Sequence, residues 1–494
     1  MYYISTRDSA LRLSAAEAIV QGLSRDGGLL LPAEIPALSL SDIEALAKLP
    51  YAKRAAKVMK LYLDEFSEEE LLGYAEKAYG PAKFDTDPAA PVVTLANGLH
   101  IMELWHGPTC AFKDMALQML PYLLTASLKK TGEEKTVCIL VATSGDTGKA
   151  ALEGFCDVPH TKILVFYPDG GVSEMQKLQM VTQLGGNVGV CAVKGNFDDA
   201  QTGVKKIFSD ETIREQLAEN GYFLSSANSI NWGRVLPQIA YYISAYCELL
   251  NQGKLKLGEK MNFCVPTGNF GNILAGYYAK CMGLPVQKFI CASNANNVLT
   301  DFLSTGTYDR NRPFYLTSSP SMDILISSNL ERMLYLASGS DAEVRGYMEK
   351  LNACGRYTVS ESVAAVMREV FACGCCDDAQ TAETIGKTLK EQDYLLDTHT
   401  AVACRVAEDY LSQTGDTTPT LVVSTASPFK FCSSVLSAIG VSEQAEGVVI
   451  LDQLADVTGR PVPAPLAGLA GRAVRFTQVA EKEEMPAVVT EFLR

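Results

Sequence analysis

Histidine and tryptophan are scarce in this chain, whose 494 residues include four histidines and two tryptophans. So few histidines leave little material for a histidine-based metal site or a Ser-His catalytic triad. Long unbroken apolar runs are also missing. The most membrane-like stretch, VLPQIAYYISAYCELL, contains Pro237, Gln238 and Glu248, which predicts a buried helix rather than a membrane span. We therefore expect neither a bound metal nor a membrane partner.

Positive charge is in deficit as well. Lysine and arginine total 43 against 57 aspartates and glutamates, a formal net charge of −14. This balance argues against nucleic acid and anionic membranes as partners, but it allows one small cationic pocket for an anion. The N-terminal sequence mixes Arg7, Asp8, Arg12 and Glu17 into its apolar residues, unlike a signal peptide. Fourteen cysteines without regular spacing then fit reduced thiols, so we expect a cytoplasmic protein. For its assembly we expect either a monomer or a homodimer.

The pattern along the chain predicts several units. Residues 1–92 form a mixed, mainly helical unit, because SDIEALAKLP and SEEELLGYAEKAYG have helical spacing. From about residue 97, apolar β-rich runs alternate with glycine-containing loops and helical patterns. Such alternation is typical of a doubly wound α/β architecture with mostly parallel, buried strands. We divide it into a smaller domain, 93–230, and a larger one, 231–494, in which residues 296–412 are mostly helical.

Three loops follow predicted strands and precede predicted helices, where open α/β sheets bind ligands. The first is HGPTCAFKDMALQ, which places Lys113 on a Gly-Pro turn. The second is ATSGDTG, residues 142–148, and the third is PTGNFGN, residues 266–272. Small residues let backbone N–H groups approach an anion, and a helix N-terminus adds roughly half a positive charge. Two such loops suggest two anionic groups, and a lysine beside them suggests a Schiff base with pyridoxal phosphate.

Plainer interpretations exist for each feature. Lys113 could be a solvent-facing lysine, and the Ser144–Thr147 segment could be an ordinary helix N-cap, which is compatible with ligand binding. Asn269 and Asn272 could be turn residues. Cys373-Gly-Cys-Cys376 contains a CxxC without a second pair at zinc-finger spacing, so reduced thiols at a helix end are favoured over a metal.

Six segments, in the same order along the chain, carry a resemblance to a known family. They are SRDGGLLLP, HGPTCAFKDMALQ, ATSGDTGKAA, SSANSINWGRVLPQ, PTGNFGN and LDTHTAVA. Together they closely resemble threonine synthase in its bacterial and fungal form, and the similarity extends to about residue 440. That family belongs to the pyridoxal-phosphate enzymes of the tryptophan-synthase β type (fold type II). The resemblance implies two α/β domains with pyridoxal 5'-phosphate between them.

The resemblance also implies roles for individual residues in holding the cofactor. Lys113 matches the lysine that forms the internal aldimine and later moves protons. The loop that cradles the cofactor phosphate matches Gly268, Asn269, Phe270, Gly271 and Asn272. Thr425, in VSTASP, matches the hydroxyl that contacts the pyridine nitrogen, although many relatives have histidine two residues later, where this chain has Ser427.

A second set of residues matches the family's substrate site. The loop that receives the substrate carboxylate matches Ser144, Gly145, Asp146 and Thr147. The region that holds the substrate phosphate matches Asn228, Ser229 and Arg234. A guanidinium suits that role because its planar fork can bind a phosphate through two hydrogen bonds.

The implied reaction converts O-phosphohomoserine and water to L-threonine and phosphate. One alternative keeps the fold and a similar substrate but releases 2-oxobutanoate, as a phospholyase or dehydratase would. A second alternative, a non-catalytic binding module of the same fold, would be expected to lose the lysine or the phosphate loop, and this chain retains both.

Overall fold

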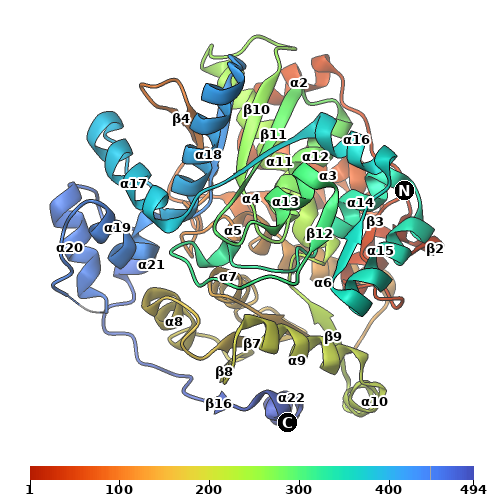
Figure 1. Cartoon of the computed structure of the whole chain (residues 1–494). Helices are drawn as coiled ribbons and strands as arrows, with labels where there is room; N and C mark the ends of the chain where they lie inside the picture. Colours follow the sequence, from red (N-terminus) through yellow and green to blue (C-terminus); the bar gives the residue numbers. More distant parts are fainter. Residues whose placement is uncertain (446) are drawn as a thin grey trace.

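Two sheets built mostly of parallel strands, with helices on their faces, form the body of the computed structural model (Figure 1). The structure describes residues 1–445 and 447–494. The larger sheet has the order β14-β11-β10-β15-β5-β4, and only the β4–β5 pair is antiparallel. Its strands are β4 (Val92–Thr94), β5 (His100–Glu103), β10 (Met261–Pro266), β11 (Val286–Ser293), β14 (Phe371–Cys375) and β15 (Thr420–Ser424). The central strands are buried almost throughout, as parallel strands covered on both faces must be.

The smaller sheet has the order β16-β8-β7-β6-β9 and is parallel throughout. Its strands are β6 (Thr136–Ala142), β7 (Thr161–Pro168), β8 (Val188–Val193), β9 (Tyr222–Ser226) and β16 (Val479–Ala480). The helices that follow or cover these strands are α7 (Asp146–Gly154), α8 (Glu174–Val181), α9 (Phe197–Ser209), α10 (Glu211–Glu219) and α22 (Met485–Phe492), with the short η3 (Lys482–Glu484) before α22. The predicted doubly wound α/β class is confirmed.

The remaining helices surround the larger sheet and connect the two sheets. They are α5 (Asp114–Leu117), α6 (Leu120–Thr131), α11 (Trp232–Asn251), α12 (Gly271–Met282), α13 (Val298–Thr305), α14 (Leu330–Ser338), α15 (Asp341–Cys354), α16 (Glu361–Val370), α17 (Asp378–Gln392), α18 (Thr398–Thr414), α19 (Cys432–Ala438), α20 (Val449–Thr458) and α21 (Ala464–Ala467). Short elements complete them: β12 (Thr307–Asp309), β13 (Arg356–Thr358), η1 (Pro320–Met322) and η2 (Pro428–Phe431). In the described part of the chain, no helix combines the length and apolarity that crossing a membrane requires.

The N-terminal unit consists of a small antiparallel sheet and four helices. These are β1 (Tyr3–Ser5), β2 (Asp8–Leu13), β3 (Leu30–Pro32), α1 (Ala15–Gln21), α2 (Leu40–Ala47), α3 (Tyr51–Tyr62) and α4 (Glu68–Tyr79). Ser14, Ser39 and Ser67 each begin a helix with a capping box, which explains where α1, α2 and α4 start. The unit shares its core with α11 and α12, so it packs as part of the larger body.

The sheets do not follow the predicted division at residues 93 and 231. Strand β5 lies in the predicted smaller domain yet pairs with β15 of the larger sheet. Strand β16 lies in the predicted larger domain yet pairs with β8 of the smaller sheet, because α22 packs Met485 and Phe492 against Gly203 and Gly189 there. The chain therefore crosses between the sheets more often than its local patterns indicate.

The segment predicted to place Cys373 and Cys376 at a helix end also differs. Helix α16 ends at Val370, and Phe371–Cys375 forms the edge strand β14. Phe371 packs against the rings of Phe270, Tyr277 and Phe289, and this contact with β11 and α12 draws the chain into the sheet. Tertiary packing here overrides a helical sequence pattern.

Trp232 is the centre of an aromatic cluster that joins the N-terminal unit to α11 and α12. Its ring lies within 5.8 Å of Tyr3, 5.6 Å of Tyr62 and 5.2 Å of Tyr278, centroid to centroid. We predict that Trp232→Ala lowers the free energy of unfolding by about 3–5 kcal/mol, because it leaves a large cavity. Urea unfolding measures this, with the half-exposed Tyr315→Ala as a control expected to change stability by less than about 0.5 kcal/mol. Equal losses in the two variants would refute the role assigned to this cluster.

Candidate active site

The three predicted loops meet in one pocket between the two sheets. Twelve of the fourteen predicted site residues line it: Lys113, Ser144, Thr147, Asn228, Ser229, Arg234, Gly268, Asn269, Phe270, Gly271, Asn272 and Thr425. The loops converge because each follows the carboxyl end of a parallel strand or the turn beside it. Gly145 and Asp146 are not among the lining residues.

Lys113 is held at the pocket by a tight turn. Asp114, fully buried, accepts hydrogen bonds from the Thr109 backbone N–H (2.8 Å) and hydroxyl (2.7 Å). Gly107 allows this closure, since a Cβ there would lie 2.6 Å from the Asp114 Oδ2 atom. The backbone N–H of Phe112 donates to the Thr425 carbonyl at 2.8 Å, which ties the turn to the end of β15. This turn places Lys113 in the wall of the pocket, in agreement with the binding-site position that we expect from the sequence.

The surroundings of Lys113 favour a neutral amine. Burial in the pocket wall and the nearby Arg234 guanidinium lower the pKa of Lys113 to about 7, while Asp146 opposes this shift. A lysine of ordinary pKa is almost entirely protonated at neutral pH and is then a poor nucleophile. The lowered pKa gives the Lys113 Nζ atom a substantial neutral fraction there.

The pH dependence of cofactor attachment follows from this pKa. In cofactor-free enzyme, the rate at which pyridoxal phosphate attaches to Lys113 should rise about tenfold per pH unit below about pH 7 and level off above it. The sign follows because only the unprotonated amine attacks an aldehyde. Stopped-flow absorbance from about pH 5.5 to 9.5 measures the rate. A rate that keeps rising to the top of this range would mean an unshifted lysine and would contradict the buried, cationic surroundings of Lys113.

The 142–148 loop is shaped by glycine and by its own hydroxyl. Gly145 has φ +131°, and a Cβ there would lie 2.3 Å from the Gln176 side chain, so only glycine fits. The Thr143 hydroxyl accepts the N–H groups of Gly145 and Gly148, both at 2.9 Å, and this turns the loop into α7. Ser144 and Thr147 consequently line the pocket.

Asp146 lies in the loop predicted to receive the substrate carboxylate, and its side chain is engaged by three neighbouring residues. Its side chain pairs with Lys430 at 2.8 Å, accepts from Gln176 at 2.9 Å and from Ser321 at 3.2 Å. Although burial alone would raise it, the paired Lys430 ammonium and the hydrogen bond from Gln176 hold the pKa of Asp146 well below its usual range. An ionised carboxylate repels another carboxylate, so we assign Asp146 a positioning role, and Gly145 the role of forming the turn.

The 266–272 loop presents backbone N–H groups at the start of α12. Phe270 has φ +61°, in the left-handed region, and directs the chain into the helix at Gly271. A Cβ on Gly268 would lie 2.9 Å from the Ser321 carbonyl. Asn272 accepts the hydroxyl hydrogens of Tyr241 (2.6 Å) and Tyr242 (2.7 Å) at Oδ1, which fixes its amide. Its Nδ2 atom, buried, has no hydrogen-bond partner among the described residues.

Arg234 supplies a buried positive charge beside this loop. It lies in the first turn of α11, with one guanidinium nitrogen bonded to the Ala227 carbonyl and with Nε lacking a partner in the described structure. Burial lowers the pKa of Arg234 to about 10, so it stays cationic at neutral pH. Arg332 is a contrast, because each of its guanidinium nitrogens donates to an oxygen: the carbonyls of Leu30, Ser229 and Ile230 and the amide of Asn329. Arg234 therefore retains donors for a ligand.

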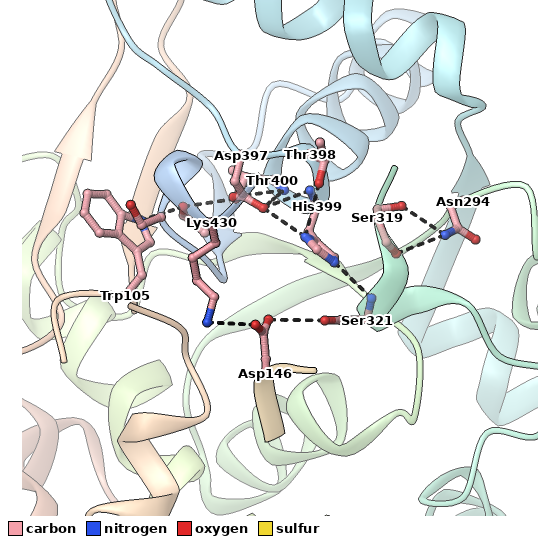
Figure 2. A network of polar contacts seen from close by, with 12 residues as sticks. Trp105, Asp146, Asn294, Ser319, Ser321, Asp397, Thr398, His399, Thr400 and Lys430 are labelled. Carbon is pink, nitrogen blue, oxygen red and sulfur yellow. Dashed lines mark hydrogen bonds and ion pairs between the residues drawn. The ribbon is translucent and has the colours of Figure 1, made fainter. Parts of the chain in front are cut away.

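Several residues at the site were not predicted from sequence. His399 lines the pocket, accepts the Ser321 N–H at Nε2 (3.1 Å), and contacts Asp397 at Nδ1 (3.1 Å). Lys430 belongs to the same polar network through its pairing with Asp146 (Figure 2). The DTH sequence at 397–399 offered a signal, because an aspartate N-cap beside a histidine can orient its ring. Nothing near Lys430 in sequence indicated its partner.

The pocket fits pyridoxal 5'-phosphate by its own chemistry. A phosphate ester needs several N–H donors, and the α12 N-terminus and the unpartnered Asn272 amide supply such donors in one pocket. An aldehyde needs a neutral amine, which Lys113 provides. This fold and site define a pyridoxal-phosphate-dependent enzyme.

Comparison with known proteins gives the family. The pyridoxal-phosphate dependent enzyme family model matches residues 91–426, the threonine synthase N-terminus model residues 2–79, and the threonine synthase C-terminal model residues 400–490. Threonine synthase of Pseudomonas aeruginosa is 39% identical over 443 residues, which cover 89% of this chain and 90% of that protein. The chain belongs to the threonine synthase family, and its cofactor is pyridoxal 5'-phosphate.

Two further relatives define the extent of the similarity. The crystal structure of pyridoxal-phosphate-bound threonine synthase from Brucella melitensis superposes with a TM-score of 0.87 at 38% identity, covering 100% of both chains. Threonine synthase-like 1 of Homo sapiens is 40% identical over 460 residues, which cover 89% of this chain. The chain spans only 61% of the length of that human relative.

Proposed function

We propose that this protein is a lyase that converts O-phosphohomoserine and water to L-threonine and phosphate, the last step of threonine biosynthesis. The observation that carries the proposal is a cationic Arg234 with an unpaired Nε atom in the same pocket as a lysine of lowered pKa. The similarity to threonine synthases along most of the chain supports the choice of reaction.

The cofactor and the substrate use different parts of the pocket in this proposal. The residues that hold the cofactor are Lys113, Gly268, Asn269, Phe270, Gly271, Asn272 and Thr425. Ser144 and Thr147 bind the substrate carboxylate with hydroxyls and with the N–H groups at the start of α7. Asn228, Ser229 and Arg234 bind the substrate phosphate, with Asn228 oriented by its bond to the Ala142 carbonyl (3.0 Å) and Ser229 by Asn329 (3.0 Å).

The mechanism needs proton transfers at three adjacent carbons of the substrate: the α-carbon loses a proton and later regains it, the β-carbon loses one, and the γ-carbon gains one after phosphate leaves. The bound cofactor supplies an electron sink that stabilises negative charge at the carbon bearing the amino group. Lys113 Nζ, with its pKa near 7, accepts a proton from that carbon and is placed to transfer the later proton at the β-carbon. Arg234 binds the departing phosphate and stabilises the negative charge that develops on it as its bond to the γ-carbon breaks. A proton then adds at the γ-carbon to give the methyl group, water adds at the β-carbon to give the threonine hydroxyl, and a proton returns to the carbon bearing the amino group.

The product balance tests this proposal against its chemical alternative. Purified holoenzyme incubated with O-phosphohomoserine should release phosphate and threonine in equal amounts. Phosphate accompanied by 2-oxobutanoate would replace threonine synthesis by a phospholyase or dehydratase reaction, with the same cofactor and site. Cofactor bound at Lys113 without any phosphate release would refute the substrate assignment through Arg234.

The division into units, the location and the assembly are also proposals. We propose three units, 1–92, 93–230 and 231–494, with β5 and β16 exchanged between the last two. We propose a cytoplasmic location, supported by fourteen cysteines that are all free thiols, with Cys281, Cys354 and Cys375 exposed. The protein acts on a small molecule as a monomer or a homodimer, and its acidic charge supports neither a nucleic-acid nor a membrane partner.

A further inference from the structure

Lys430 is a buried cation that bonds two of the loops forming the pocket. Its side chain, in the short helix η2, is fully screened from solvent. Nζ donates to the Thr109 carbonyl at 2.9 Å and pairs with Asp146 Oδ1 at 2.8 Å. Thr109 belongs to the turn that carries Lys113, and Asp146, within the 142–148 loop, is the first residue of α7. One ammonium group therefore spans the lysine turn and the proposed substrate loop.

Helix α8 makes contacts with the same two oxygen-bearing groups. Gln176 donates to Asp146 Oδ1 at 2.9 Å, and Gln179 donates to the Thr109 carbonyl at 3.4 Å. A buried charge is costly unless it is paired and hydrogen-bonded, so the Lys430 ammonium depends on both the Asp146 carboxylate and the Thr109 carbonyl. Contacts from η2 and from α8 thus hold Thr109 and Asp146, and with them the two loops, at a fixed separation.

The other oxygen of Asp146 is bonded to a residue of the short helix η1. Ser321 Oγ donates to Asp146 Oδ2 at 3.2 Å, while the Ser321 backbone N–H donates to His399 Nε2 at 3.1 Å. His399 is held in turn by Asp397, at the N-terminus of α18. Figure 2 shows these groups as one chain of polar contacts from Lys430 through Asp146 and Ser321 to His399.

We propose that Lys430 is a positioning residue of the active site, which fixes the Lys113 turn relative to the 142–148 loop by bonding Thr109 and Asp146 together. It acts through these two groups, because Lys430 does not itself line the pocket. This role goes beyond the proposed reaction, since it concerns how the cofactor lysine and the loop are held whatever the substrate is.

The electrostatic effect of the pair on Lys113 gives the role a measurable signature. Asp146 raises the pKa of Lys113, whereas Lys430 lowers it. The other titratable groups that Lys430 acts on are the buried Asp114 and Cys110, and His399 acts on Asp146 from α18. Removing the Lys430 charge should therefore favour the protonated form of the Lys113 nitrogen, and removing the Asp146 charge should favour the unprotonated form.

The test uses holoenzyme variants and two readouts that need no substrate. The first is the pH at which the visible absorbance of the bound cofactor changes by half, which reports the protonation of the nitrogen through which Lys113 holds the cofactor. Lys430→Met should move this midpoint to higher pH and Asp146→Asn to lower pH, each by about half a unit or more. The double variant, which removes both charges, should return near the wild-type value, and Lys430→Arg should stay close to it because the cation remains.

The second readout is hydrogen exchange of backbone amides. In Lys430→Met, peptides covering residues 107–113 and 143–148 should both exchange faster, while peptides from α17 should not change. Folding is checked independently by the thermal midpoint, and the charge-neutral double variant provides a folded comparison if Lys430→Met is unstable. Midpoints that shift in the same direction in both single variants, or unchanged exchange in both peptides, would overturn the proposal. Because no substrate is used, failure of the proposed reaction leaves this test valid.

Discussion

Replacing Lys113 by alanine is expected to abolish covalent cofactor attachment and to lower the rate of phosphate release at least about a thousandfold. The reason lies in the pocket geometry: Lys113 is the one lysine among the described residues that line this pocket, and burial beside Arg234 gives it a pKa of about 7. Cofactor should still enter the pocket, because the α12 N-terminus and Asn272 are unchanged. Borohydride reduction followed by peptide mass spectrometry measures attachment, and a continuous phosphate assay measures activity.

Two variants serve as controls for Lys113→Ala. Lys113→Arg retains a positive charge and a long side chain but cannot act as a nucleophile, so it should be as inactive as alanine. Lys177→Ala, at an exposed position on α8, should behave like the wild type. Covalent attachment that persists at another lysine in Lys113→Ala would show that the wrong residue has been identified.

Replacing Arg234 by methionine should lower kcat/KM for the phosphorylated substrate by about 30-fold to a few thousandfold. Methionine fills the space but removes the buried guanidinium, whose Nε atom has no partner among the described residues. The loss should appear mainly in KM if the phosphate contact is the same in the ground and transition states, and in kcat if it strengthens as phosphate departs. Steady-state phosphate release over a range of substrate concentrations separates these cases.

Arg234→Lys and the cofactor content sharpen the interpretation. Lysine keeps the charge without the planar fork, so it should recover part of the activity. The amount of bound cofactor should stay near one per chain in both variants. If Arg234→Met instead loses its cofactor while KM in the loaded fraction is normal, Arg234 binds the cofactor phosphate and its assignment to the substrate is wrong.

The parts of the site that sequence could predict are those built from local patterns. Each loop is a short run of small residues between a β-rich run and a helical one, so residue order alone is enough to locate 142–148 and 266–272. Lys113 could be singled out because its turn, its glycine and its aspartate lie within one segment. The parallel arrangement of strands then required these loops to converge at one edge of the sheets.

The parts that sequence could not predict depend on contacts between distant segments. The pairing of Asp146 with Lys430 joins α7 to η2, and no local feature of the sequence indicates this partner. The exchange of β5 and β16 between sheets has the same origin, because a strand's sequence favours burial without specifying its neighbour. The edge strand β14 escaped prediction since it continues an amphipathic helix and is fixed by the packing of Phe371.

The most direct test of the central claim is the fate of solvent oxygen during turnover. Holoenzyme should be incubated with O-phosphohomoserine in water enriched in oxygen-18, and both products analysed by mass spectrometry. We predict cleavage of the bond between the γ-carbon and oxygen, with water added at the β-carbon. The label should then appear in the threonine hydroxyl and be absent from the phosphate. Labelled phosphate together with homoserine would mean simple phosphoester hydrolysis and would contradict the roles given to Lys113 and Arg234.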